Sequence, residues 1–138
     1  MPETLIARAA REYLDHTLAS WTATRSLACF DDGALASYRA AFVDPARIHA
    51  MCEDYRATAG VDLEMDSRDY AAGRKIETPL LLLWGATGAV GRIHKPAEIW
   101  KHYAADISGA AALPCGHYLS EEAPEETYRA LHEFFAAP

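Results

Sequence analysis

Apolar residues recur at helical spacing through the first half of the chain. In residues 2–22 an apolar stripe falls on one face of a helix: Leu5, Ala9, Tyr13, Leu14 and Leu18. Pro2 is a residue that helices accept at their first position. This pattern predicts one continuous helix over residues 2–22.

Three further helices are predicted before the pattern changes. The second, over residues 31–44, begins with two aspartates, either of which can serve as the N-cap. The third opens at Pro45, and Gly60 is placed to end it. A fourth follows directly and ends at Gly73. The first half of the chain is therefore predicted to be helical.

The pattern changes at Pro79. Four leucines and a tryptophan form a continuous apolar run between Pro79 and Gly85, which is typical of a strand buried on both faces of a parallel sheet. A helix from Pro96, a weaker strand at 107–113 and a last helix at 121–135 follow. This order of strands and helices indicates an α/β fold.

The number of strands is too small for a complete sheet. Only two strands are predicted, and two parallel strands alone leave open edges and do not form a stable sheet. We therefore expect this chain to be the back portion of a larger α/β fold, with at least one unpaired strand edge.

Composition narrows the classes of function. The chain has 138 residues, 51% of them hydrophobic, and a formal net charge of −7, which argues against nucleic-acid or acidic-membrane binding. No apolar run approaches the length of a membrane span. Three cysteines without a CxxC pair fit reduced thiols, so we expect a cytoplasmic protein.

Several motifs for cofactors, metals and nucleophiles can be tested against the sequence. Residues 85–91 match a G-x-x-G-x-x-G turn, but Pro96 prevents a long helix from following, and no acidic strand end lies about 20 residues later. None of the six histidines forms an HxxxH or HExxH pair, and no G-x-S-x-G elbow exists. We therefore expect no cofactor, no metal and no serine nucleophile.

The neighbouring residues in the sequence do not decide the role of two groups of residues. His117 follows the last strand, where open α/β sheets bind ligands, so it is either a catalytic base or an ordinary loop histidine. Cys115, only two residues earlier, is interpreted as buried packing. Around Tyr55, the charged residues Glu53, Asp54 and Arg56 are either a salt-bridged helix face or part of a binding site.

Four motifs carry a family resemblance. They are MCEDYRA at 51–57, PLLLLWGATG at 79–88, IWKHYAADISG at 99–109 and CGHYLSEEAPEET at 115–127. Together they resemble the fluoroacetate (haloacetate) dehalogenases of the α/β-hydrolase superfamily. The resemblance covers nearly the whole chain but only the C-terminal half of such an enzyme. It implies a partial α/β-hydrolase fold, with a helical cap segment at 1–58 and a C-terminal portion of the core at 59–138.

The resemblance also implies roles for individual residues. His117 matches the histidine that activates water, Tyr55 a tyrosine of the halide pocket, and Trp21 a cap tryptophan near the substrate entrance. The nucleophilic aspartate, its acid partner and the carboxylate-binding arginines would lie before Met1. Gly88 stands where many α/β hydrolases carry the acid, and this departure agrees with the dehalogenase subfamily.

The sequence therefore predicts the C-terminal half of a haloacetate dehalogenase, in which His117, Tyr55 and Trp21 act on a small haloacid. We expect the isolated chain to be inactive, and to need the missing N-terminal half or to self-associate as a dimer through its open sheet edge. Two alternatives are a non-catalytic interaction module derived from a hydrolase, and the tail of an epoxide or ester hydrolase of the same superfamily.

Overall fold

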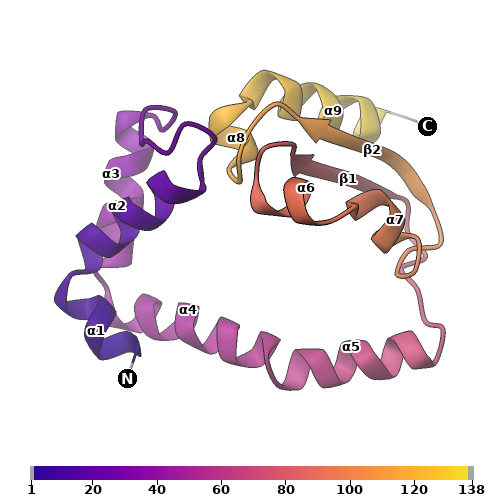
Figure 1. Cartoon of the computed structure of the whole chain (residues 1–138), viewed down its shortest axis with the longest axis horizontal. Helices are drawn as coiled ribbons and strands as arrows, with labels where there is room; N and C mark the ends of the chain where they lie inside the picture. Colours follow the sequence, from indigo (N-terminus) through magenta and orange to yellow (C-terminus); the bar gives the residue numbers. More distant parts are fainter. Residues whose placement is uncertain (1, 137–138) are drawn as a thin grey trace.

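The structure is a computed structural model that describes residues 2–136, and within that range it contains nine helices and two strands. Five helices come first: α1 (Pro2–Arg8), α2 (Ala10–Trp21), α3 (Asp32–Phe42), α4 (Pro45–Thr58) and α5 (Val61–Ala71). They are followed by β1 (Leu80–Gly85), α6 (Ala89–Ile93), α7 (Pro96–Trp100), β2 (Ile107–Leu113), α8 (Leu119–Glu122) and α9 (Pro124–Ala136). In Figure 1, α4 and α5 run one after the other along one side, and the strands lie opposite them.

The predicted helix over residues 2–22 is interrupted at Ala9, which has φ −143° and ψ 46° and separates α1 from α2. The side chains that are buried recur every four residues: Ile6, Ala10, Leu14 and Leu18. Leu5, which the sequence placed on the buried face, is 61% exposed. The predicted stripe was therefore wrong at Leu5, Ala9 and Tyr13, which are exposed, and correct at Leu14 and Leu18. The buried face continues from α2 into α1 through Ala10 and Ile6.

The helix ends follow the local chemistry of the sequence more closely. Asp31 caps α3, because its side chain accepts hydrogen bonds from two backbone N–H groups of the first turn. Asp44, just before Pro45, caps α4 by accepting one from the N–H of Ala46. Gly73 has φ +67° just after α5, which only glycine adopts without strain. Gly60 lies between α4 and α5 and serves as the N-cap residue of α5.

The two predicted strands are confirmed. β1 and β2 form a parallel sheet in which Leu81 pairs with Gly109 and Gly85 with Leu113. Within residues 2–136 no strand pairs with the other edge of β1. Two predicted helices are shorter than expected, since the one from Pro96 ends at Trp100 and the last is divided into α8 and α9. The fold is a partial α/β fold, as predicted, and the domain boundary at residue 58 stays a prediction.

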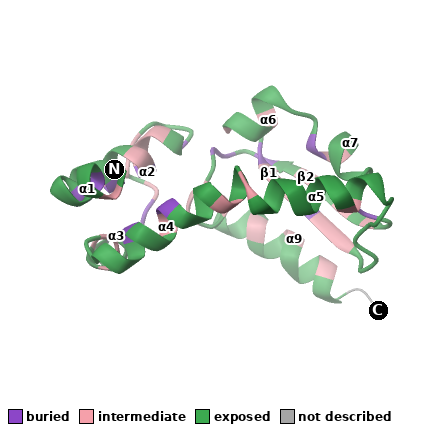
Figure 2. Ribbon diagram, turned by 90° about the horizontal axis from the view of Figure 1, so that it is seen from below, coloured by how far each residue is buried: buried purple, intermediate pink, exposed green. Residues whose placement is uncertain are grey.

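The buried residues form three small clusters. Two lie among the first four helices, around Ile48 and Leu18, and the third joins the end of β2 to α8 through Leu113, Cys115 and Ala123. Figure 2 shows that α5, in contrast, is exposed almost throughout, and none of its residues is buried. No helix within residues 2–136 combines the length and the apolar character needed to span a membrane.

Candidate functional site

The turn Gly116–His117–Tyr118 lies just beyond β2 and contacts the end of α2. The backbone N–H of His117 donates a hydrogen bond of 3.0 Å to the carbonyl oxygen of Trp21. The imidazole and the indole meet edge to face, with ring centroids 4.6 Å apart and planes at 79°. Two residues that the sequence predicted for the site, His117 and Trp21, are thus brought together although 96 residues separate them.

The carboxylate of Glu122 fixes the shape of this turn. One of its oxygens, Oε2, accepts hydrogen bonds from the backbone N–H groups of Ala23 at 2.7 Å and Gly116 at 3.0 Å. The other, Oε1, accepts one from the N–H of Tyr118 at 3.0 Å. Sequence reasoning missed Glu122, because nothing in the acidic run from residue 121 to 126 distinguishes it from its neighbours.

Close backbone packing explains the glycine-rich segment that follows β1. A Cβ atom at Gly85 would lie 1.6 Å from the carbonyl oxygen of Gly116, and one at Gly88 would lie 2.9 Å from it. A Cβ at Gly116 would lie 2.5 Å from the backbone nitrogen of Ala23. These glycines let the loop after β1, the His117 turn and the end of α2 come into contact.

A hollow of about 270 Å³, which we call the His117 pocket, opens beside this turn. Trp21 and Arg25 line one side, and Thr87 and Arg92 line the other. The lining within the described residues contains two arginines and no carboxylate, although the chain has a net charge of −7. The pocket is therefore suited to a small anion.

Arg25 reaches this pocket from an unusual turn. Its φ of 53° is the only positive φ of a non-glycine residue in the part of the chain that the structure describes. The turn is stabilised by Thr22, whose hydroxyl accepts a 3.0 Å hydrogen bond from the N–H of Ser26 and lies 2.9 Å from the carbonyl oxygen of Ala19, to which it donates. A non-glycine residue in this region costs about 1–3 kcal/mol, so the surrounding contacts must hold it there.

The other predicted site residue, Tyr55, does not line the His117 pocket. Its side chain lies on α4 and is 62% exposed. The pKa of Tyr118 is raised, first by burial, then by Glu121 and Glu122, and to a smaller extent by Tyr55. The role of Tyr55 at a halide pocket stays a prediction.

The charged residues around Tyr55 form a salt-bridged helix surface. Arg56 donates to Glu3 at 2.6 Å and also pairs with Glu53, so it joins α1 to α4. The pKa of Glu3 is lowered to about 2, first by a backbone hydrogen bond and then by Arg56. Glu3, Glu53 and His49 are close enough together to hold a metal ion, but the guanidinium of Arg56 already binds both carboxylates.

Cys115 behaves as the sequence predicted. Its side chain is 1% exposed and packs with Leu113 and Ala123, and none of the three cysteines of the chain is in a disulfide. Burial, followed by the charges of Glu122 and Glu126, raises the pKa of its thiol. A thiol that is both inaccessible and hard to ionise is a poor nucleophile.

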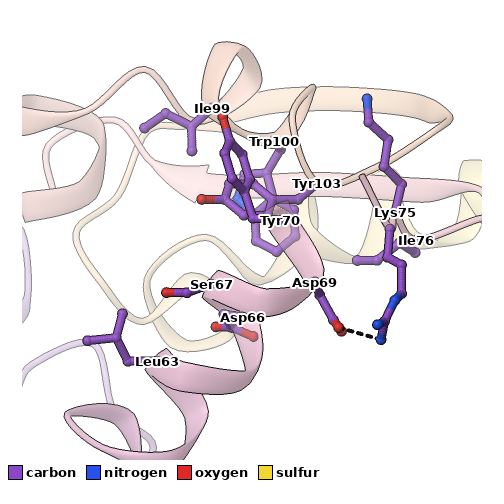
Figure 3. Close-up of a pocket in the computed structure, with 11 residues that line it drawn as sticks. Leu63, Asp66, Ser67, Asp69, Tyr70, Lys75, Ile76, Ile99, Trp100 and Tyr103 are labelled. Atoms are coloured by element: carbon purple, nitrogen blue, oxygen red, sulfur yellow. Dashed lines mark hydrogen bonds and ion pairs between the residues drawn. The ribbon is translucent and has the colours of Figure 1, made fainter. Parts of the chain in front are cut away.

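A second hollow lies between α5 and α7 and is shown in Figure 3. We call it the α5–α7 groove, and its apolar lining consists of Leu63, Tyr70, Ile76, Ile99, Trp100 and Tyr103. The ring centroids of Tyr70 and Tyr103 are 5.5 Å apart, and Asp69 pairs with Arg74 at 2.6 Å at one end. The groove is larger, at about 740 Å³, but no histidine or cysteine lines it. The His117 pocket therefore has the better chemistry for catalysis.

Comparison with known proteins finds relatives over nearly the whole chain. The chain is 33% identical to a fluoroacetate dehalogenase from Burkholderia sp. over 135 residues, which are 98% of this chain and 43% of that protein. A proposed α/β hydrolase from Nostoc sp. PCC 7120 superposes on 100% of this chain and 46% of its own, with a TM-score of 0.92 and 46% identity.

A third relative carries a different name. A proposed epoxide hydrolase from Pseudomonas aeruginosa covers 98% of this chain with a TM-score of 0.85 and 41% identity, over 44% of its own length. No family model matches the chain. The chain therefore spans less than half of the length of each of these relatives, and the resemblance that the sequence motifs predicted is confirmed over nearly all of its residues.

Proposed function

Because this chain has the C-terminal part of an α/β-hydrolase fold, we propose that it supplies the general base of a hydrolase that cleaves the carbon–halogen bond of a small haloacid. The base is His117, and the indole of Trp21 lies against it. The proposal assigns the nucleophile to the N-terminal half that the relatives carry.

The observation that carries this proposal is the charge of the His117 pocket. A haloacid bears a carboxylate, and the lining of the pocket contains Arg25, Arg92 and His117 but, among the described residues, no acidic side chain. Guanidinium groups bind carboxylates through paired N–H donors. The volume of about 270 Å³ suits an acid of a few heavy atoms.

The proposed reaction has two steps. A carboxylate nucleophile attacks the carbon that bears the halogen, a new carbon–oxygen bond forms, and the halide leaves with the bonding electrons. His117 then takes a proton from water, and the resulting hydroxide attacks the ester carbonyl. The bond between the acyl carbon and the substrate oxygen breaks, that oxygen takes the proton from the imidazolium, and the hydroxy acid leaves with the carboxylate nucleophile restored. In this scheme Tyr55 donates its phenolic hydrogen to the departing halide.

The open edge of the sheet is the basis for the partner that we propose. β1 has a strand partner on one side only within residues 2–136, and α5 presents apolar side chains to solvent. Unpaired edges and exposed apolar patches are covered in stable proteins. We propose that the N-terminal half of a hydrolase covers both, and that the chain alone, in a cytoplasmic setting, forms dimers through the same edge.

An epoxide hydrolase is the second candidate, because one structural relative bears that name. Epoxides are neutral, so two arginines beside the base give them no advantage. The third candidate, a non-catalytic module, would bind a partner through the apolar surface, and His117 would have no catalytic role. The charge of the substrate therefore distinguishes the first two candidates, and turnover distinguishes both from the third.

The test is co-expression of the chain with the N-terminal half of the Burkholderia relative, followed by halide-release assays on chloroacetate and fluoroacetate. We expect release from the pair and none above background from the chain alone. His117→Ala should leave one halide released per site and abolish turnover, while His132→Ala on α9 should change neither.

Substrate charge is tested in the same system. Arg25→Gln with Arg92→Gln should raise KM for chloroacetate about tenfold or more, because a charged hydrogen-bonded pair contributes about 1.5–3 kcal/mol, and should leave neutral chloroacetamide unaffected. Arg129→Gln is the matched control. Turnover of epoxides but not of haloacids would favour the second candidate, and no turnover of either would favour the third.

A further inference from the structure

Glu122 contacts three backbone N–H groups that belong to two segments far apart in sequence. We propose that Glu122 is a positioning residue that holds the base His117 against Trp21, so that the cap segment and the base turn act as one unit. This inference rests on the proposed role of His117, but its structural part can be tested without activity.

The hydrogen bonds themselves carry the inference. The N–H of Ala23, two residues after Trp21, and the N–H of Gly116, just before His117, donate to the same oxygen of Glu122 at 2.7 and 3.0 Å. Within the described residues only one other hydrogen bond joins residues 20–26 to residues 113–122, and it runs from the N–H of His117 to the carbonyl of Trp21. The carboxylate thus supplies one of the two hydrogen bonds between these segments, and the same oxygen also binds the N–H of Gly116 next to the base.

An ordinary helix cap does not account for this arrangement. A glutamate in the first turn of α8 can bond back to the N–H of Tyr118, the N-cap residue, and Glu122 does so at 3.0 Å. The bonds to Ala23 and Gly116 lie outside α8 and add nothing to helix capping. Both of these N–H groups would otherwise need another acceptor, because the two segments are in contact there.

Close packing adds a second, independent observation. A Cβ at Gly116 would lie 2.8 Å from Oε1 of Glu122 and 2.7 Å from the carbonyl oxygen of Trp21. Residue 116 can therefore only be glycine if the carboxylate and the cap segment are to reach the turn together. The lack of room around Gly116 shows that the carboxylate of Glu122 and the end of α2 both pack directly against the turn.

The neighbouring glutamate provides a matched control. The side chain of Glu121 accepts a hydrogen bond from the hydroxyl of Tyr38 at 2.9 Å and one from Ser120, and within the described residues this side chain has no hydrogen bond to residues 20–26 or 116–118. Glu122→Gln keeps the size of the side chain but has one acceptor oxygen in place of two. Its single oxygen can accept a hydrogen bond from the N–H of Tyr118 or from those of Ala23 and Gly116, but not from all three. Its NH₂ group would then point at the N–H donors that are left without an acceptor.

The experiment is amide hydrogen exchange and NMR on the full chain. In Glu122→Gln we expect exchange at least about tenfold faster at Ala23, Gly116 or Tyr118, because hydrogen bonds to a charged acceptor are lost. The ring protons of His117 should also lose the ring-current shift that the indole of Trp21 imposes at 4.6 Å. Glu121→Gln should change neither readout.

A measurement without a variant at residue 122 covers the case in which Glu122→Gln does not fold. In the unaltered chain, the amide protons of Ala23, Gly116 and Tyr118 should exchange with similar protection factors, because one carboxylate holds all three. Widely different protection factors, unchanged exchange in Glu122→Gln, or the same response in Glu122→Gln and Glu121→Gln would overturn the inference. In the co-expressed pair, Glu122→Gln should lower kcat and spare the halide burst. An inactive pair with the expected NMR changes would contradict only the proposed function.

Discussion

The His117 turn and helix α5 differ sharply in how they are held. The turn is fixed by three hydrogen bonds to one carboxylate, by a bond to Trp21 and by glycines that leave no room for a Cβ atom. Helix α5 has no buried residue, and Val61, Leu63 and Met65 are each more than half exposed. One region is complete within the chain, and the other has apolar side chains that nothing in residues 2–136 covers.

This contrast separates a region that is fixed by internal contacts from a surface that is left exposed. The turn that carries His117, the residue we propose as the base, is held by contacts among the end of β2, α8 and the loop after α2. The apolar side chains of α5 and the open edge of β1, which we propose to bind the N-terminal half of a hydrolase, are left uncovered within residues 2–136. A piece with these properties is expected to retain the site while depending on a partner for stability and activity.

The largest expected effect is a loss of stability when the packing around the His117 turn is disrupted. In Gly85→Ala the new methyl group would meet the carbonyl oxygen of Gly116 at 1.6 Å, so the loop after β1 and the His117 turn must separate. We expect a loss of about 3 kcal/mol or more in the free energy of unfolding, measured by urea denaturation.

Gly33→Ala is the control for that experiment. Its Cβ would meet only the side chain of Asp31, at 3.1 Å, on the exposed first turn of α3. Alanine favours helix over glycine by up to about 1 kcal/mol, so the control should be neutral or slightly stabilising. Equal losses in the two variants would mean that the contact between Gly85 and Gly116 is not the cause.

An intermediate effect is expected on α5, and it should appear in association and not in stability. Leu63→Lys replaces a side chain that is 58% exposed and lies in the lining of the α5–α7 groove. The free energy of unfolding of the isolated chain should change by less than about 0.5 kcal/mol. Binding to the N-terminal half, or self-association, should weaken about tenfold or more by light scattering and co-purification.

A substitution on the charged side of the same helix serves as the control. Asp62→Lys changes the charge of α5 without removing an apolar side chain, so it should weaken association less than Leu63→Lys does. If the two variants weaken it equally, the apolar surface of α5 does not carry the interaction.

The smallest effect concerns the ion pair between α2 and α3. Arg39 donates two hydrogen bonds of 2.8 Å to Asp15, and these lower the pKa of Asp15 below its ordinary value of 3.8, against the opposing effect of burial. A carboxylate whose pKa is lowered in the folded state adds stability above pH 3.8. That stability is lost as the pH falls through the folded value.

Arg39→Gln should therefore flatten the loss of stability that occurs as the pH falls below 3.8, as followed by urea midpoints at several pH values. Both side chains are about one quarter exposed, so the effect should be modest and should shrink in high salt. Arg47→Gln is the control, because its partner Asp44 lies 3.8 Å away and is half exposed. An unchanged acid profile in Arg39→Gln would exclude a stabilising role for the pair.

Local chemistry in the sequence was enough to predict much of the fold. The caps at Asp31 and Gly73, the two strands and the incompleteness of the sheet all depend on residues that are neighbours in the chain. The break at Ala9 could not be predicted, because alanine is a good helix former. Contacts from α4, where Ile48 and Cys52 pack on Ile6 and Ala10, accompany the change of direction there.

The residues of the candidate site were also predicted only in part. His117 and Trp21 were predicted from a family resemblance, and the structure places their rings in contact. Glu122, Arg25 and Arg92 were missed, since their meaning lies in contacts between segments that only the folded chain brings together. The spacing of the glycines at 85–91 matches a cofactor-binding turn, but Gly85 and Gly88 approach the backbone around Gly116, and Gly91 approaches the carbonyl oxygen of Gly85.

The hydrogen bond between Ala23 and Glu122 has a consequence for the order of events in folding. It spans 99 residues, so the chain must close a very long loop before the bond can form. The entropy of loop closure is lost before such contacts repay it, and contacts of long sequence separation accordingly slow folding. The capped helices and the turns at their ends can form early from nearby residues. We therefore expect the His117 turn to reach its final geometry late, in the step that limits the folding rate.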